Sequence, residues 1–176
     1  MNHGANKVKI NDHQQLAEGS ILKSNHQEPE DQFALTKMQE KRRLQQAVVY
    51  GKAALKDFFK KQSYESTSDG RNPFEIAFAD FLNAPSIDSI DLSEYSGRIG
   101  SRISVTVIDD FSVSSVYVKI QNADGTIADE GYASPGLFST EWIFTASQSN
   151  PDLSGDKITI TATDLPGNDS LMERIL

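Results

Sequence analysis

Apolar and polar residues alternate along the second half of the chain, from about residue 87 to residue 176. Ile103, Val105 and Val107 are separated by polar residues, and the same period of two returns in several later runs. This alternation is typical of antiparallel strands that bury one face and expose the other. It predicts strands over residues 90–92, 103–107, 116–120, 126–132, 141–145, 157–163 and 171–175.

Residues that favour turns separate these runs, for example Asp124-Gly125 and Pro135-Gly136. Seven short strands in about 90 residues predict an immunoglobulin-like sandwich. The antibody hallmarks are absent, because the chain has no cysteine and its single tryptophan, Trp142, lies on the fifth predicted strand. Trp142 alternates with polar neighbours and is expected in the core.

Residues 32–85 predict a helical hairpin. The apolar residues from Leu44 to Phe59 recur at spacings of three, four and seven, which is one stripe along a helix. A second helix is expected to begin with Asn72 as its cap, Pro73 at its first position and Glu75 completing a capping box, and to end before Pro85. Residues 1–31 are mostly polar and are expected to form a disordered tail. The fold class is therefore α+β: a helical hairpin followed by an all-β, seven-stranded immunoglobulin-like sandwich over residues 86–176.

Charge is distributed unevenly between the two halves. Residues 1–85 hold 12 Lys and Arg against 11 Asp and Glu, whereas residues 86–176 hold 5 against 14. An acidic domain of this kind argues against a nucleic-acid partner. No apolar run approaches the roughly 20 residues of a membrane helix, so no membrane span is expected. The N-terminal residues lack the apolar stretch of a secretory signal, which favours a cytoplasmic location by default.

Candidate catalytic chemistry is sparse, and the chain is expected not to be an enzyme. All three histidines, His3, His13 and His26, lie in the predicted tail, so the folded region has no histidine base. The complete absence of cysteine excludes disulfides and thiolate chemistry.

Calcium is a possible cofactor. Asp109 and Asp110 follow the second predicted strand, while Asp164 and Asn168 flank the last turn. These two loops share one end of an immunoglobulin-like sandwich, where four oxygen-bearing side chains could meet as hard ligands. The alternative is that they only hydrogen-bond to amides of their own turns. For a partner surface, the candidates that face outward are Tyr95, Tyr117 and Tyr132.

The helical segment enters the first strand at this same end of the sandwich. We therefore expect the helices to dock there, with a cationic helix face approaching the acidic residues of the two loops.

Two phrases of the second half resemble bacterial immunoglobulin-like domains. The sequence TATDLPGN at residues 161–168 is similar to their T-A-T-D-x-x-G-N ending. The sequence VIDDF at residues 107–111, with the alternation that follows it, resembles their D-D-x-G-V-x-S-V-x-V segment, although Ser112 replaces the usual glycine. The sequence AFADFLNAPSI at residues 77–87 also resembles a group of small bacterial proteins that join such helices to one immunoglobulin-like domain.

The resemblance implies an architecture rather than an activity, and the domains it points to usually serve as adhesive, spacer or accessory binding modules. The expected function is a non-catalytic interaction or structural module that presents a surface to a protein partner. A calcium-dependent or carbohydrate-binding module is the alternative.

Overall fold

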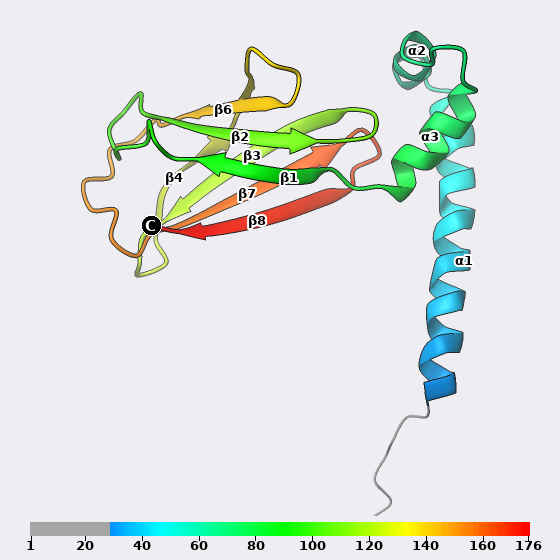
Figure 1. Cartoon of the computed structure of the whole chain (residues 1–176), viewed down its shortest axis with the longest axis horizontal. Coiled ribbons are helices and arrows are strands. Elements are labelled where there is room, and N and C mark those ends of the chain that lie inside the picture. The colour runs from blue at the N-terminus through cyan, green and yellow to red at the C-terminus, as the bar shows by residue number, and fades with distance from the viewer. Residues whose placement is uncertain (1–28) are drawn as a thin grey trace, which may run out of the picture.

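The computed structural model describes residues 29–176, with side chains described from Gln32 onward, as three helices followed by two antiparallel sheets of four strands each (Figure 1). The predicted tail lies outside the described residues, except that its last three residues belong to the first helix. The helices are α1 (Pro29–Ala54), α2 (Phe58–Ser66) and α3 (Pro73–Leu82). The strands are β1 (Ser86–Asp91), β2 (Arg102–Ile108), β3 (Val113–Gln121), β4 (Ile127–Tyr132), β5 (Ser134–Pro135), β6 (Glu141–Thr145), β7 (Lys157–Asp164) and β8 (Asp169–Ile175).

The expectation of two helices is wrong, because the first predicted helix is broken. Asp57 has an extended backbone, and its Oδ1 atom accepts a hydrogen bond from the amide of Lys60 at 2.9 Å. A carboxylate in this position caps a new helix, so α1 ends at Ala54 and α2 begins at Phe58. The predicted apolar stripe is interrupted there, which leaves Phe58 and Phe59 73% and 77% exposed.

The cap and the proline at the start of α3 agree with the prediction, but among the described residues no hydrogen bond joins Glu75 to Asn72 as a capping box requires. Pro73 occupies the first turn, and the amide of Phe74 donates to Oδ1 of Asn72 at 3.0 Å. Helix α1 packs on α3 through small residues: Ala47 and Ala54 are buried, and a Cβ atom placed on Gly51 would lie 2.9 Å from the Phe74 ring. This close approach joins the two helices into one unit.

One sheet has the strand order β1-β2-β6-β5 and the other β4-β3-β7-β8. The predicted alternation is confirmed in β2, β3, β6 and β7, whose alternate apolar residues are buried between the sheets. In β8 only Met172 packs against this core, and Leu171 and Ile175 are exposed. The structure has one strand more than predicted, the two-residue strand β5, which pairs with β6. The core contains Ile87, Ile103, Val105, Val107, Val116, Val118, Ile120, Ala133, Trp142, Phe144, Ala146, Ile158, Ile160 and Ala162.

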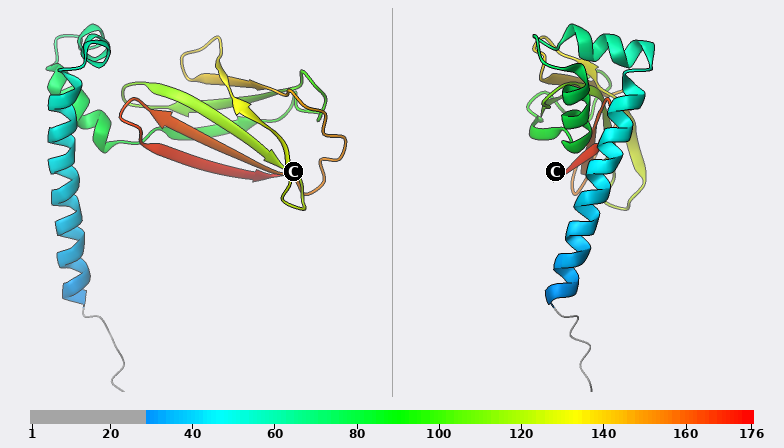
Figure 2. Two further views of the ribbon diagram at one scale, coloured as in Figure 1. Left: turned by 180° about the vertical axis from the view of Figure 1, so that it is seen from behind. Right: turned by 90° about the vertical axis from the view of Figure 1, so that its right-hand side faces the viewer.

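The helices lie at one end of the two-sheet unit, with α3 between α1 and the sandwich (Figures 1 and 2). The β2–β3 and β7–β8 turns point toward them, and the end of β8 lies at the opposite end. Among the described helices, none combines the length and the apolar character that crossing a bilayer requires.

Candidate functional site at the helix–sandwich junction

The junction between the helices and the sandwich is built from side-chain contacts. Asn168, in the β7–β8 turn, donates from Nδ2 to the backbone carbonyls of Asp80 and Phe81 at 3.3 and 3.2 Å. Asn83 donates from Nδ2 to Oδ2 of Asp110 at 2.7 Å. The rings of Tyr64 and Phe111 lie 4.4 Å apart between centroids. These contacts confirm the predicted docking of the helices at this end.

The charge at this junction differs from the expectation. The helix that meets the loops is α3, which contributes Asp80, so an additional carboxylate faces the acidic loops in place of a cationic helix face. Over residues 32–176 the ion pairs within 4.0 Å are Lys61–Glu65 and Lys157–Glu173, and neither lies here. The expected approach of cations is therefore wrong, because the lysines and arginines of α1 and α2 do not pair with these carboxylates.

Asp80 is the most deeply buried member of the group, with 1% of its surface exposed. Its Oδ2 atom accepts the hydroxyl of Tyr64 at 2.5 Å, and the Tyr64 hydroxyl lies 2.8 Å from that of Tyr50. The pKa of Asp80 is raised to about 7, above all by burial. The hydrogen bond from Tyr64 works against this rise, and the charges of neighbouring aspartates add to it. Burial also raises the pKa of Tyr64, so this phenol stays a donor.

Asp109 and Asp110 bring two more carboxylates to Asp80. One oxygen of each of the three groups lies within 4.8 Å of the others. Oδ2 of Asp109 accepts the amide of Ser112 at 2.7 Å, which holds the β2–β3 turn. Burial raises the pKa of Asp109, and the hydrogen bond from the Ser112 amide lowers it by less. The charges of Asp110 and Asp164 raise this pKa further. The Oδ1 atoms of Asp80 and Asp109 are buried and have no hydrogen-bond partner.

Asp164 and Asn168 have a different role from the one expected of metal ligands. Oδ1 of Asp164 accepts the amides of Gly167 and Asn168 at 2.8 and 2.6 Å, and its Oδ2 accepts Nδ2 of Asn168 at 2.6 Å. Both oxygens of this buried carboxylate are thus engaged in forming the β7–β8 turn. The structure therefore groups two of the four predicted residues, Asp109 and Asp110, with Asp80.

Asp80 was not predicted as a site residue, because it lies on a helix far from the loops in the chain. One signal was present: Asp80 is a single charged residue in the apolar segment IAFADFL. A buried charge in such a segment needs a specific partner.

The three candidate tyrosines lie in two places. Tyr117 on β3 and Tyr132 on β4 are directly paired across the sheet, and their rings meet edge to face with centroids 5.0 Å apart. Tyr132 is 71% exposed. Tyr95 is partly buried against the sandwich core, so it does not belong to this outward surface.

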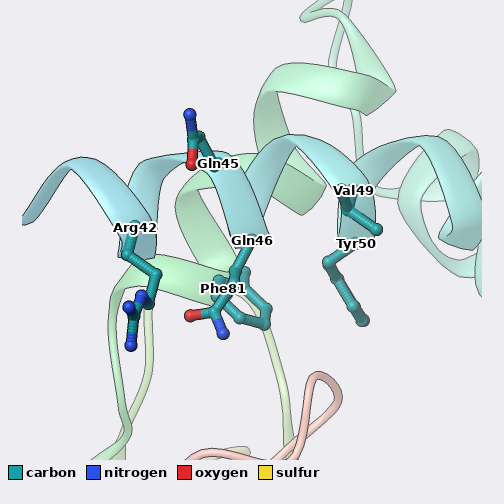
Figure 3. A pocket seen from close by; sticks show the side chains of 6 residues that line it. All are labelled: Arg42, Gln45, Gln46, Val49, Tyr50 and Phe81. Atoms are coloured by element: carbon teal, nitrogen blue, oxygen red, sulfur yellow. The ribbon is translucent and has the colours of Figure 1, made fainter. Parts of the chain in front are cut away.

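An open groove of about 430 Å³ runs beside α1, and Figure 3 shows the residues that line it. Tyr50 and Phe81 form its apolar part, with ring centroids 5.3 Å apart. Arg42 and Gln46 extend toward the same side and give the groove a polar edge.

No protein-family model matches the sequence, and none of the curated proteins compared with it is similar. Among solved structures, the crystal structure of an engineered protein aligns with 50% of this chain at 20% identity and a TM-score of 0.32. The alignment spans 19% of the engineered protein's own length. A similarity of this size gives no basis for transferring a fold or a function.

Proposed function

We propose that the two-sheet unit is an immunoglobulin-like domain of the bacterial type and that the chain is a non-catalytic module that binds a protein partner. The strand orders support this fold, since β1-β2-β6-β5 and β4-β3-β7-β8 correspond to the A-B-E-D and C′-C-F-G sheets of immunoglobulin-like sandwiches. The two family-like phrases support it too, because they occupy the β2–β3 and β7–β8 turns.

The outer face of the β4-β3-β7-β8 sheet is the surface that we assign to the partner. The strand register aligns one row of residues across all four strands. Tyr132 and Leu171 lie at the two ends of this row, and both side chains are exposed, Leu171 by 64%. The row consists of Tyr132, Tyr117, Thr161 and Leu171.

This row carries the proposal because its chemistry suits a protein surface. Tyrosine rings bury a large area at low entropic cost and are enriched in the centres of protein interfaces. The adjacent row is polar, with Lys119, Glu130 and Glu173 at aligned positions. An apolar row beside a polar one resembles the core and rim of an interface. The acidic balance of residues 86–176 disfavours a nucleic acid at the same face.

The test uses a photo-crosslinking residue at the exposed position 130 of the full chain, in the polar row beside Tyr132, to identify a partner in cells. The purified partner is then titrated with the wild type, with Tyr132→Ser and with Leu171→Ser. We expect each change to weaken binding at least about tenfold, as removal of a well-buried interface residue does.

Ile143→Ser is the matched control, because Ile143 lies on β6 in the other sheet, between the buried Trp142 and Phe144. It should leave the affinity unchanged. Equal affinities for all three variants would contradict the proposed surface.

A further inference from the structure

Three carboxylates meet at the junction although they come from two different parts of the chain. Asp80 belongs to α3, whereas Asp109 and Asp110 belong to the turn that follows β2. One oxygen from each lies within 4.8 Å of the other two. Bringing like charges together in a largely buried place is unfavourable unless a counter-charge or a proton compensates.

The hydrogen bonds at this site leave two oxygens unsatisfied. Tyr64 occupies Oδ2 of Asp80, and the amide of Ser112 occupies Oδ2 of Asp109. The remaining Oδ1 atoms of Asp80 and Asp109 are buried without a partner. Buried carboxylate oxygens are normally paired, so two unpaired atoms in one cluster of carboxylates point to a missing positive group.

No side chain of the described residues supplies that group. Arg71 lines a small cavity together with Asp110 and Glu75, but it makes no ion pair with either within 4.0 Å. Asn83 donates a neutral amide to Asp110. Asp164 lies close by, because Nδ2 of Asn168 bonds both to its Oδ2 atom and to the backbone carbonyl of Asp80, and it adds negative charge to the surroundings.

We propose that a hard divalent cation of the calcium class binds between Asp80, Asp109 and Asp110 and bridges helix α3 to the sandwich. Calcium takes oxygen ligands at about 2.3–2.6 Å, so two oxygens on one ion lie no more than about 5 Å apart. The separations at this site satisfy that limit. Asp110 is exposed, so water completes the coordination from the outer side.

This site differs from a calcium site made only by the loops of the sandwich. Asp164 and Asn168 form the adjacent turn and are not ligands, whereas Asp80 brings a ligand from the helices. The bound cation therefore links the two parts of the chain, and it stabilises their docked arrangement by its binding free energy.

The experiment is a calorimetric titration of the full chain, previously treated with a chelator, with calcium chloride and separately with magnesium chloride. We expect one calcium site with a dissociation constant in the micromolar to millimolar range. Asp80→Asn and Asp109→Asn should each weaken it at least about tenfold. Asp88→Asn, an exposed carboxylate on β1, is the matched control and should leave it unchanged.

Terbium luminescence provides a second measurement that does not depend on stability. Tyr64 is hydrogen-bonded to Asp80, so excitation of tyrosine should sensitise a terbium ion at this site, and calcium should displace the signal. Asp80→Asn should abolish the sensitised emission while circular dichroism shows a folded chain. Absence of calcium heat at millimolar concentration, or calcium binding that Asp80→Asn leaves intact, overturns the proposal.

Discussion

The hydroxyl of Tyr64 donates to Oδ2 of Asp80 over 2.5 Å, and both side chains are shielded from water. Tyr50 lies at the other side of the same hydroxyl, so with Tyr64 donating to Asp80, Tyr50 donates to Tyr64. This chain of three polar groups connects α1, α2 and α3 beneath the junction. Removing only the donor of such a hydrogen bond lowers the free energy of unfolding markedly, because the buried acceptor is left without a partner.

Replacing Tyr64 with phenylalanine should therefore destabilise the fold. We expect a loss of about 1–3 kcal/mol in the free energy of unfolding, the cost of leaving a buried polar group unpaired. The loss should be larger at about pH 8 than at about pH 6, because the hydrogen bond favours the charged form of Asp80. Urea unfolding at the two pH values measures both effects.

Tyr50→Phe is the control for this variant. It removes the outer member of the chain and leaves Asp80 paired with Tyr64, so the expected loss is smaller and depends little on pH. Equal losses of unfolding free energy in the two variants would contradict the prediction that the Tyr64–Asp80 hydrogen bond contributes more than the Tyr50–Tyr64 one.

Stability should fall as the pH rises toward neutrality in chelator-containing buffer. The ordinary pKa of the Asp80 carboxyl is 3.8, and in the folded chain it is raised to about 7. Between these values the folded state holds a proton that the unfolded state has released, so the contribution of Asp80 is lost at up to about 1.4 kcal/mol per pH unit. It is fully present below the lower pKa and gone above the higher one.

Asp80→Asn should make this part of the pH profile less steep, because asparagine cannot ionise, and leave the slope that the raised pKa of Asp109 contributes. Thermal or urea unfolding from about pH 5 to about pH 8 compares the variant with the wild type. The carboxylates with lowered pKa, Asp91, Asp124 and Glu173, lose their favourable contribution only at lower pH and so leave this window unaffected. A wild-type profile that is level across the window would contradict the prediction.

Asn168→Ala should loosen the docking of the helices. The substitution removes the donor to the carbonyls of Asp80 and Phe81 and also the bond to Oδ2 of Asp164. We expect a loss of about 1–3 kcal/mol and faster amide exchange over residues 73–82. Asn122→Ala is the matched control, because Asn122 bonds to Thr126 in the exposed β3–β4 turn at the other end of the sandwich. Exchange in α3 should not change in that variant.

Gly97→Ala should be strongly destabilising. Gly97 has φ +70°, and an added Cβ would lie 2.0 Å from the backbone oxygen of Asn150, which cannot move aside. Gly100→Ala is the control, since Gly100 has φ +87° and open space around it. The control carries only the cost of the left-handed backbone, about 1–2 kcal/mol. The difference in unfolding free energy between the two variants isolates the steric clash, and no difference would mean that the loops separate freely.

The positions and buried faces of β2, β3, β6 and β7 followed from the sequence, whereas β1 begins at Ser86, before the predicted range of 90–92. Residues such as Val105 and Ile160 alternate with polar neighbours, and this period of two can only be satisfied with one face buried. The start of α3 was also determined locally, because Asn72 and Pro73 act within one turn. The break after Ala54 was missed, since an apolar stripe continues across it and the capping role of Asp57 competes with that stripe.

Which acidic residues meet depends on how the helices and the sheets pack together. The sequence pointed to Asp109, Asp110, Asp164 and Asn168 because all four lie in turns at one end of the predicted sandwich. Whether a turn aspartate binds its own amides or faces a neighbour depends on distances of a few ångströms that no local pattern encodes. Asp80 joined the group because α3 packs across that end, through contacts between residues more than 80 positions apart, such as those of Asn168. Local sequence preferences determine where helices and strands form. The surroundings of a buried charge such as Asp80 depend instead on how those helices and strands pack together.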